Sequence, residues 1–542
     1  MTSSSVIETI EQRPGQETLA GNPLPANKWI IALRSEAFCR FLALLTGAIL
    51  GLSAPGMEQW YLAWCAFAPV IVLAVTAREP WYAGVRGWFF FTGYNLVALN
   101  FCLSVRQELF EGIFSLMTGL SVLVILFIIA ALKGMLGSIF CLWLKAIPMT
   151  GGFLPLKNQG RWLMPGFLVI PLLWVVIDYL CYPPEFLGVR WTSLEYSQYR
   201  QLPLIQLASI TGGAGITICL ILSNLTLLGI IGFCTKRIKC LTYPNSKALL
   251  LNTTLSVLLL TAVINFGNQR INSENDAFAK KKKLTVSAIQ SNLCQKIHGV
   301  DFGVIHKKNL ELTKECPPNS IVIWPEWSFP AIFSKAYSHL EPFSKPARDQ
   351  KQSWVLGCID EDEKGQHFNS SIVMDKARGT LPMVYHKRYL VPFGEFTPKW
   401  VKETPFGWIL YGKNKTYEET ASGNTPVCFP IEEVVLGPML CFECEEPSIS
   451  RDSVRNGAQL LVDSSYTGWF HNSILSDQMI AFCVMRSVEN HRSFVFSTTL
   501  GPSAIIDSTG RILRQAPREE SAALTAEVPI ESDTTLFTRF SF

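Results

Sequence analysis

Long uncharged runs fill the first half of this sequence and stop about half-way along it. Between residues 41 and 266, apolar runs of roughly 20 residues recur, which is the length that a helix needs to cross the hydrocarbon core of a membrane. From residue 280 onward, short apolar runs alternate with charged residues, glycine and proline. This second pattern is typical of a layered α/β domain. The sequence therefore predicts a membrane half followed by a globular half.

The apolar half predicts about seven membrane spans. Residues 41–77 are typical of a helical hairpin with short arms, because Pro55 and Gly56 interrupt the run. Residues 112–144 are interpreted as one long span that continues into an interfacial helix, and two spans are the alternative. The other predicted spans are 87–105, 163–181, 202–234 and 248–266.

The basic residues of the short loops predict how these spans are oriented. With the N-terminus in the cytoplasm, most lysines and arginines of the loops fall on the cytoplasmic side, in line with the positive-inside rule. The exceptions are Arg106, Arg190 and Arg200. An odd number of spans then places the globular half on the side of the membrane opposite to the cytoplasm. Asp178 lies inside a predicted span, where a charge is costly, and is interpreted first as a packing partner and second as a functional group.

Domain limits follow from the same patterns. The lysine run at 280–283 is interpreted as a solvated tether, with contact to anionic lipid headgroups as the alternative. The N-terminal region lacks the charged-then-apolar pattern of a cleavable signal peptide. The predicted regions are a cytoplasmic tail at 1–40, a transmembrane domain at 41–266, a linker at 267–283, a globular domain at 284–530 and a C-terminal tail at 531–542.

Composition favours a membrane protein and excludes several other classes. Mean hydropathy is +0.25, and 49% of residues are apolar against 17% charged, which is too apolar for an ordinary soluble protein. The net charge of +4 gives no reason to expect a nucleic-acid partner. The 15 cysteines lie partly in apolar runs and have no regular spacing, so no disulfide framework is predicted. No metal and no cofactor are expected.

The globular half predicts strands that alternate with helices. Short runs rich in Val, Ile and aromatic residues, bounded by Gly, Pro, Asn and Asp, are typical of strands. They occur at 283–290, 320–324, 353–358, 370–375, 383–386, 434–441, 459–462, 493–497 and 503–506. Helices are predicted at 302–312 and 477–492.

Two strand ends carry groups suited to covalent catalysis. Glu326 follows a buried strand that Pro325 ends, and the flanking Trp324 and Trp327 would raise its pKa, as a general base requires. Cys441 ends a strand and precedes several carboxylates, and it can act as a nucleophile if a base and a cation activate it. Each residue also has a simpler interpretation. Glu326 can be a solvated turn residue, and Cys441 a small buried hydrophobe.

A third patch, residues 385–396, concentrates basic and aromatic residues. Within it, Lys387 can stabilise a thiolate and an oxyanion, and its simpler interpretation is a basic residue on an edge strand. His386 is a further candidate base. Cys441 and Cys444 also form a Cys-x-x-Cys pair, which is a weak zinc or redox signal because no second pair follows.

The order of these groups, a Glu after a strand, then a Lys, then a Cys after a strand, resembles the carbon–nitrogen hydrolase (nitrilase) superfamily. The surrounding residues resemble one family within it, the apolipoprotein N-acyltransferases, over roughly residues 41–540. In the globular half the matching motifs are Trp324-Pro325-Glu326, Tyr385-His386-Lys387, residues 390–398 and Arg486-x-x-Glu489-x-x-Arg492. In the membrane half they are Trp191 and residues 196–198, 203–208 and 212–215.

This resemblance implies an α-β-β-α sandwich after the α-helical membrane domain. It implies Glu326 as general base, Lys387 as stabiliser of the tetrahedral intermediate and Cys441 as the acylated nucleophile, with Glu395 and Glu443 as supporting carboxylates. It implies that a phospholipid gives an acyl chain, through a thioester, to the N-terminal amine of a diacylglyceryl-cysteine lipoprotein. It also implies a monomer in the bacterial inner membrane, with the catalytic domain on the periplasmic side.

Several positions depart from the family pattern. Phe442 stands where the family usually has Tyr, and residues 466–471 lack both polar residues of its Asn-Asp-x-Trp-Phe-Gly motif. Cys294 and Gly299 stand where a Pro and a Trp are usual, and the chain stops at Phe542 without the family's final span. These differences concern the lid, the substrate range and the C-terminal topology.

Two other functions are weighed against the acyltransferase. A membrane-tethered amidase or nitrilase would hydrolyse small amides without lipid, and it leaves the matching membrane half unexplained. A non-enzymatic membrane protein with a degenerate domain would account for the altered residues. The ordered set of Glu326, Lys387 and Cys441 argues against it.

Overall fold

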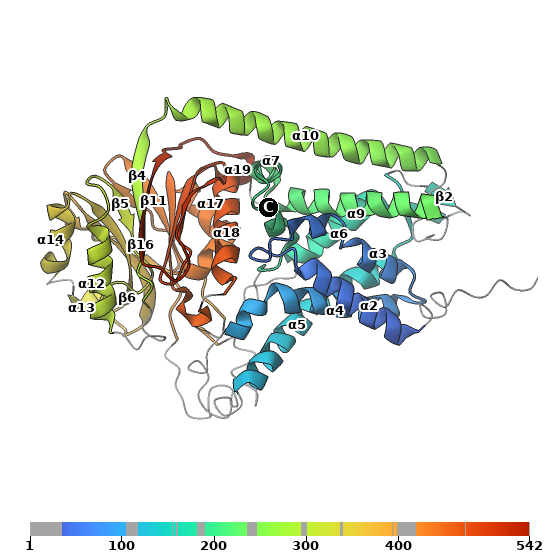
Figure 1. Ribbon diagram of the computed structural model, residues 1–542, viewed down its shortest axis with the longest axis horizontal. Helices are drawn as coiled ribbons and strands as arrows, with labels where there is room; N and C mark the ends of the chain where they lie inside the picture. Colours follow the sequence, from blue (N-terminus) through green and yellow to red (C-terminus); the bar gives the residue numbers. More distant parts are fainter. Residues whose placement is uncertain are drawn as a thin grey trace, which may run out of the picture.

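The computed structural model places two halves side by side, with the helices of the first at one end and the sheets of the second at the other (Figure 1). It describes residues 35–104, 118–153, 156–158, 161–180, 190–235, 246–293, 301–336, 340–392, 394–397, 419–471 and 473–540. Outside these ranges lie the predictions on residues 1–34, Arg106, Cys181, Cys294, Gly299, Phe393, Pro398 and Phe542.

Helices make up most of the membrane half. They are α2 (Glu36–Gly51), α3 (Ala68–Val75), α4 (Pro80–Ala98), α5 (Thr118–Ala146), α6 (Gly166–Leu180), α9 (Gly213–Thr235) and α10 (Ser246–Phe278). Shorter elements are η1 (Trp60–Trp64), η2 (Asn100–Ser104), η5 (Leu194–Gln198), β1 (Met149–Thr150), β2 (Leu156–Asn158) and β3 (Arg161–Pro165). Within the described ranges, 3 helices are long and apolar enough to cross a membrane, at Val122–Ala146, Gly213–Thr235 and Lys247–Phe278. The count of seven spans stays a prediction.

The predicted span at 202–234 is interrupted, so this prediction is wrong for its first part. Two single-turn helices, α7 (Leu202–Ile205) and α8 (Ala208–Thr211), precede α9. The chain turns at Gly212, whose φ of +62° suits glycine. A Cβ at this position would lie 2.9 Å from the ring of Phe537 in the globular half. The interruption therefore places α7 and α8 at the contact between the two halves.

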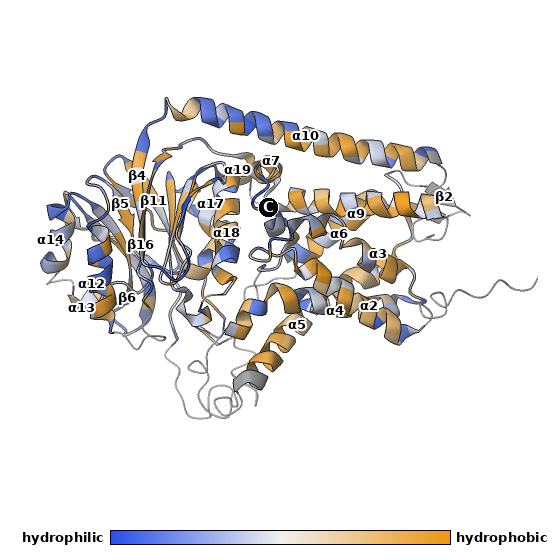
Figure 2. Cartoon of the chain, viewed as in Figure 1, coloured by the Kyte–Doolittle hydropathy of each residue, from blue (hydrophilic) through white to orange (hydrophobic). Residues whose placement is uncertain are grey.

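A single long helix, α10, joins the halves. It runs through much of the predicted linker, as far as Phe278, and β4 begins at Lys283. The linker prediction at 267–283 is therefore corrected to helix over most of its length, because residues 267–278 contain no proline and α10 packs closely on α7. A Cβ at Gly267 would lie 1.8 Å from the carbonyl oxygen of Pro203. The helix is apolar over its first half and polar near the globular half (Figure 2).

The globular half contains two sheets. One has the strand order β16-β4-β5-β6-β7-β8, with β9 paired to β7, and the other has the order β10-β11-β12-β13-β14-β15. The first comprises β4 (Lys283–Gln290), β5 (Ile321–Ile323), β6 (Ser353–Glu361), β7 (His367–Asp375), β8 (Gly379–Thr380), β9 (Tyr385–His386) and β16 (Ala522–Pro529). The second comprises β10 (Phe429–Ile431), β11 (Val434–Leu440), β12 (Leu460–Ser465), β13 (Ser493–Thr498), β14 (Ala504–Ile506) and β15 (Ile512–Gln515).

Side chains of the strands alternate between two apolar cores. On β5, Ile321 and Ile323 share a core with Leu436 and Val462 of the other sheet, whereas Val322 packs with α12 and α14. This period of two is what a strand buried on both faces requires.

Helices flank the two sheets. Those beside the first sheet are α12 (Phe302–Thr313), α13 (Phe333–Ala336) and α14 (Glu341–Asp349). Those beside the second are η7 (Cys441–Glu445), α17 (Pro447–Arg455), η8 (Thr467–Phe470), α18 (Leu475–Asn490) and α19 (Leu536–Arg539).

The C-terminal residues pack against the globular half, so the described part of the predicted tail at 531–542 is not free. Thr535 Oγ1 donates to the carbonyl oxygen of Glu489 at 2.5 Å, at the end of α18. Arg455 Nε donates to the carbonyl oxygen of Thr538 at 2.7 Å. The core beneath α18 continues into the membrane half, where the rings of Phe482 and Tyr196 lie 4.5 Å apart.

Candidate active site

Strand ends bring the predicted catalytic side chains together. Glu326 follows β5, Lys387 directly follows β9, and Cys441 directly follows β11 as the first residue of η7. Lys387 Nζ lies 3.8 Å from Glu326 Oε1, and Cys441 lies close enough to both for their charges to act on its thiol. Cys441 has a φ of 54°, which is strained for a non-glycine residue and turns the main chain sharply. The base, the cation and the thiol that the sequence singled out thus share one site.

Burial and mutual charge set the proton affinities of these groups. Glu326 is 3% exposed and Lys387 is 1% exposed. Burial raises the pKa of Glu326, and the Lys387 cation opposes this rise. Burial also raises the pKa of the Cys441 thiol, and the Glu326 carboxylate adds to the rise. Burial alone would lower the pKa of Lys387, but Glu395 and Glu326 reverse this effect and hold it above its usual value. Such a site holds a thiol, a strengthened base and a fixed cation.

The two predicted supporting carboxylates are each held by several donors. Glu395 accepts from Lys387 Nζ at 2.8 Å and from the backbone N–H of Val391 at 2.8 Å. Glu443 accepts from the hydroxyl of Tyr385 at 2.7 Å. It also accepts three backbone N–H groups, at 2.6–3.0 Å, from Arg388, Tyr389 and Leu440. Glu395 therefore fixes the cation, and Glu443 ties the turn after Cys441 to the segment that carries Lys387.

Known proteins share both halves of this chain. The family model of the apolipoprotein N-acyltransferase N-terminal domain matches residues 46–226, and that of the carbon-nitrogen hydrolases matches residues 300–534. The first match lies in the membrane half. The second contains Glu326, Lys387 and Cys441. The chain belongs to the apolipoprotein N-acyltransferase family. The predicted carbon–nitrogen hydrolase fold of the globular half is confirmed.

Relatives within the family match most of the chain. The apolipoprotein N-acyltransferase of Geobacter metallireducens is 29% identical over 92% of this chain and 91% of its own length. That of Photobacterium profundum is 28% identical over 68% of this chain and 69% of its own length. Among solved structures, the carbon-nitrogen hydrolase from Helicobacter pylori G27 is 16% identical, with a TM-score of 0.36, over 46% of this chain and 89% of that one.

Three buried polar residues next to the site carried no signal in the strand and helix pattern. Asn369 donates from Nδ2 to both Glu326 and Glu395. Asp463 on β12 accepts from Ser465 Oγ, and burial raises its pKa. The third residue belongs to a family motif, so the resemblance offered a hint. This third residue is Arg486. Its guanidinium donates to the carbonyl oxygen of Glu445, at the end of the turn after Cys441, at 2.7 Å.

Two alternative site residues have other partners. His386 Nε2 lies 3.0 Å from Asp360 Oδ2, and its ring stacks on Phe368, so the imidazole is engaged away from the thiol. Cys444 is fully buried beneath α18, next to Cys483. These contacts favour a packing role for Cys444.

The residue after the nucleophile is the middle ring of a three-ring stack. Phe442 lies between Trp191 of the membrane half, at 5.2 Å, and Tyr389, at 5.7 Å. The interplanar angles are 20° and 5°. Offset parallel rings at such separations attract one another as well as excluding water. At this position, ring stacking joins the nucleophile turn to both halves.

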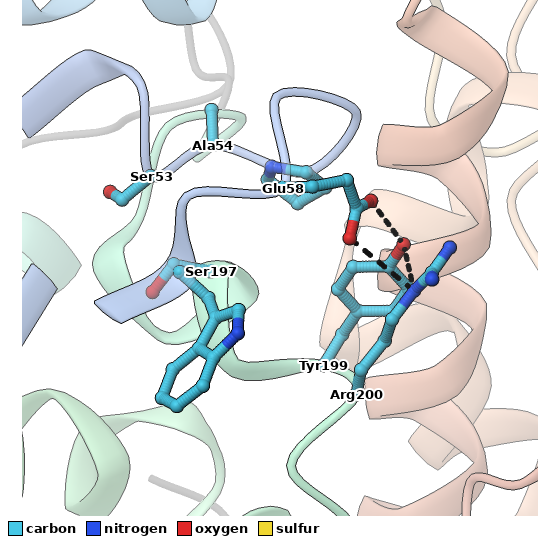
Figure 3. Close-up of a pocket in the computed structure, with 8 residues that line it drawn as sticks. Ser53, Ala54, Glu58, Ser197, Tyr199 and Arg200 are labelled. Carbon is cyan, nitrogen blue, oxygen red and sulfur yellow. Dashed lines mark hydrogen bonds and ion pairs between the residues drawn. The ribbon is translucent and has the colours of Figure 1, made fainter. Parts of the chain in front are cut away.

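Polar side chains of the membrane half are paired with one another. Asp178 accepts from Ser193 Oγ at 2.9 Å, which supports its interpretation as a packing partner. A shallow hollow of about 10 Å³ is lined by residues that include Glu58, Tyr199 and Arg200 (Figure 3). There Glu58 Oε1 accepts from the Tyr199 hydroxyl at 3.1 Å, and Arg200 Nε donates to the same hydroxyl at 2.8 Å. Because these groups satisfy one another, no ligand is assigned to the hollow.

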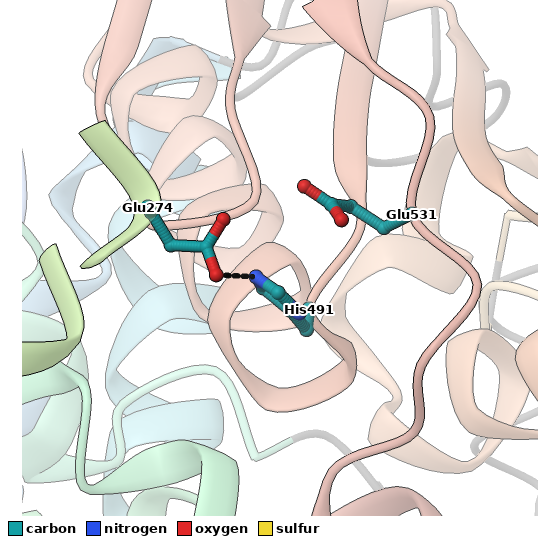
Figure 4. A group of neighbouring side chains, drawn as sticks. All are labelled: Glu274, His491 and Glu531. Atoms are coloured by element: carbon teal, nitrogen blue, oxygen red, sulfur yellow. Dashed lines mark ion pairs between the residues drawn. The ribbon is translucent and has the colours of Figure 1, made fainter. Parts of the chain in front are cut away.

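One cluster at the end of α10 has the composition of a metal site. The ligand atoms of Glu274, His491 and Glu531 lie within 4.8 Å of one another (Figure 4). Lys281 Nζ, however, lies 2.6 Å from Glu274 and 2.8 Å from Glu531. The carboxylates thus already share a cation that belongs to the chain, and the cluster is an ion-pair network.

Proposed function

We propose that this protein transfers an acyl chain from a phospholipid to the N-terminal amine of a diacylglyceryl-cysteine lipoprotein, through a thioester on Cys441. The observation that carries the proposal is that Glu326, Lys387 and Cys441 meet in a carbon–nitrogen hydrolase domain joined directly to apolar helices. Both substrates are anchored in lipid, so a catalytic domain held at the membrane can meet both. The family membership supports the same reaction.

The first half-reaction forms the thioester. Glu326 takes the proton of the Cys441 thiol, and the thiolate attacks the ester carbonyl of the phospholipid. The Lys387 ammonium stabilises the oxyanion of the tetrahedral intermediate. When the intermediate collapses, the carbon–oxygen ester bond breaks, and the leaving alkoxide of the lysophospholipid takes the proton back from Glu326. The acyl chain is then bound to sulfur.

The second half-reaction transfers the chain. The neutral α-amine of the diacylated lipoprotein attacks the thioester carbonyl, and Lys387 again stabilises the oxyanion. Glu326 takes a proton from the nitrogen as the carbon–nitrogen bond forms. The carbon–sulfur bond then breaks, and the thiolate recovers that proton from Glu326. One base thus serves both steps, and no cofactor takes part.

The proposal extends to the setting of the enzyme. About seven spans would cross the bacterial inner membrane, and an α-β-β-α sandwich at 284–530 would lie on the periplasmic side as a monomer. The polar second half of α10 supports this arrangement, because it carries β4 beyond the apolar part of the helix. The exposed leucines of the first half, such as Leu250 at 68% and Leu258 at 58%, suit contact with lipid chains.

One assay tests the reaction. Purified full-length protein in detergent is mixed with a phospholipid and a diacylated lipopeptide, and the peptide mass is read afterwards. We expect a gain of one acyl chain with wild type and none with Cys441→Ala, because the thioester cannot form without the thiol. Cys428→Ala, which removes a half-buried cysteine elsewhere on the domain, is the matched control and retains transfer.

Two results of that assay would contradict the proposal. Full activity of Cys441→Ala would show that no thioester on this residue is needed. Turnover of small soluble amides without lipid, together with no transfer to the peptide, would support the amidase alternative instead. A mass increase on Cys441 after incubation with phospholipid alone is expected for wild type.

A further inference from the structure

Asn369, on β7, lies between the two carboxylates that flank Lys387. Its Nδ2 is 2.5 Å from Glu326 Oε1 and 2.9 Å from Glu395 Oε1, and the side chain is buried at 4% exposure. An ionised carboxylate only accepts hydrogen bonds, so the amide nitrogen, with its two hydrogens, must be the atom that faces both. One neutral group therefore holds two anions apart.

The main chain of the same residue positions the cation. The backbone N–H of Lys387 donates to the carbonyl oxygen of Asn369 at 2.8 Å, next to the pairing of Ser370 with His386 between β7 and β9. Lys387 Nζ then lies 2.8 Å from Glu395 and 3.8 Å from Glu326. One strand residue thus sets the places of all three charged groups, through its side chain and its backbone.

We infer that Asn369 is a positioning residue that keeps Glu326 available as the base, by donating hydrogen bonds to both carboxylates without adding charge to the site. The inference rests on the proposed function, in which Glu326 accepts the proton of the Cys441 thiol. It assigns no direct contact between Asn369 and substrate.

The charges around Glu326 explain why a neutral donor is needed. Lys387 and Glu395 face it from the segment after β9, the Cys441 thiol from η7 and the Asp463 carboxyl from β12. This set contains more carboxyls than cations in a buried space. Two close carboxylates in such a space tend to share a proton, which would occupy the oxygen that the thiol needs. Hydrogen bonds from Asn369 favour the ionised form and lower the pKa of Glu326 toward its usual range.

The test compares two variants of nearly the same size with a control on the same strand. Asn369→Leu removes both donors, and Asn369→Asp replaces them with a further carboxyl. The control is Ser371→Ala, because the Ser371 hydroxyl is buried on β7 without a hydrogen-bond partner among the described residues. Far-UV circular dichroism and Tm show which proteins are folded. Two rates are then measured from pH 6 to pH 9, namely acylation of Cys441 by phospholipid in a single turnover and alkylation of Cys441 by iodoacetamide.

We expect Asn369→Leu to slow both reactions roughly tenfold at pH 7, the effect of one lost hydrogen bond to a charged group. The acid limb of the pH–rate profile moves to higher pH, so the difference in rate between Asn369→Leu and wild type becomes smaller as pH rises. Asn369→Asp moves the limb further, and Ser371→Ala follows wild type. A loss of the same factor at every pH, or unchanged profiles in both variants, would overturn the inference. Absence of acylation in wild type, with normal alkylation profiles, would instead contradict the proposed function while the alkylation data still decide the role of Asn369.

Discussion

At the scale of single residues, Glu445 shows how burial can outweigh nearby cations in setting the charge of a carboxyl near the site. It closes the turn that begins at Cys441, is fully buried, and neither of its carboxyl oxygens has a hydrogen-bond partner among the described residues. Burial raises its pKa to about 8, Glu446 adds to the rise, and Arg190 and Arg486 oppose it. At neutral pH the side chain therefore holds its proton in the folded protein.

This proton gives stability a defined pH dependence. The folded pKa lies above the unfolded value, so the folded state binds more protons between about pH 4.5 and pH 8. The free energy of unfolding consequently falls as pH rises through this interval. Glu445→Gln lacks this titration, and its stability relative to wild type is expected to rise by roughly 4 kcal/mol across the interval, because the slope approaches about 1.4 kcal/mol per pH unit and is shallower at both ends.

Thermal unfolding in detergent at pH 5, 6.5 and 8 measures this effect. The Tm of Glu445→Gln should move upward relative to wild type as pH increases. The exposed Glu520→Gln serves as the control and should follow wild type at each pH. Parallel curves for wild type and Glu445→Gln would mean that Glu445 is ionised in the folded protein.

Individual residues of the site could be predicted from the sequence only where a strand end or a motif marked them. Glu326, Lys387 and Cys441 stand at such ends, and the structure brings their side chains together. Asn369 lies one residue before a predicted strand, and its role depends on partners far along the chain. Asp463 likewise lies one residue after a predicted strand, and its burial beside Glu443 and Glu326 depends on segments far apart in the chain.

At the scale of elements, α2 and α4 pack with their backbones in contact. A Cβ at Gly47 would lie 1.8 Å from the carbonyl oxygen of Phe90, and one at Gly93 would lie 2.2 Å from that of Leu44. Lipid chains are as apolar as leucine, so membrane helices associate through such close contacts between small residues more than through hydrophobicity. The two glycines therefore set the distance between these helices.

Gly93→Leu tests this contact. The added side chain cannot fit without separating α2 from α4, so we expect a loss of about 1–3 kcal/mol in the free energy of unfolding, as for other overpacked sites. Leu45→Phe adds bulk to the outer face of α2, where Leu45 is 47% exposed, and should leave stability unchanged. Tm and the monodisperse fraction in size-exclusion chromatography are the measurements. An unchanged Tm for Gly93→Leu would disprove the close contact.

Most strands of the globular half were predictable, whereas several helices, such as α14 and α17, were missed. Strands such as β4 and β11 appear as apolar runs bounded by turn residues, and their predicted limits agree with the structure within a residue. The strand β16 was missed because only two of its eight residues are buried and it has no continuous apolar run. The break at Gly212 and the helix through the predicted linker depend on contacts with distant segments, Phe537 and Pro203.

At the scale of the whole molecule, an ion-pair network fastens the end of α10 to the globular half (Figure 4). His491 Nε2 lies 3.2 Å from Glu274 of α10, and Nδ1 lies 3.0 Å from Asp533. Lys281 joins Glu274 to Glu531, and Arg270 and Arg492 complete the charges around the imidazole. Because α10 connects the membrane half to β4, this network helps to fix the orientation of the catalytic domain.

The attachment of the end of α10 to the globular half is expected to weaken as pH rises. Burial alone would lower the pKa of His491, but Asp533 and Glu274 more than offset this and raise it above its ordinary value of 6.5. A histidine with a raised folded pKa contributes stability that is fully present below the unfolded pKa and is lost as pH rises through the folded pKa. Above that pH, neutral His491 no longer attracts Glu274 and Asp533, and the end of α10 separates more readily from the globular half.

Trypsin cleavage after the lysines at 280–283 reports this separation, because the protease needs an extended, released segment. Cleavage rates at pH 6 and pH 8.5 are divided by the rate of trypsin on a short lysine peptide at the same pH. We expect the corrected rate for wild type to rise several-fold with pH, whereas His491→Gln is cleaved fast at both. His367→Gln, on β7 far from α10, should behave as wild type. Equal corrected rates for wild type at the two pH values would mean that the charge of His491 does not hold α10 in place.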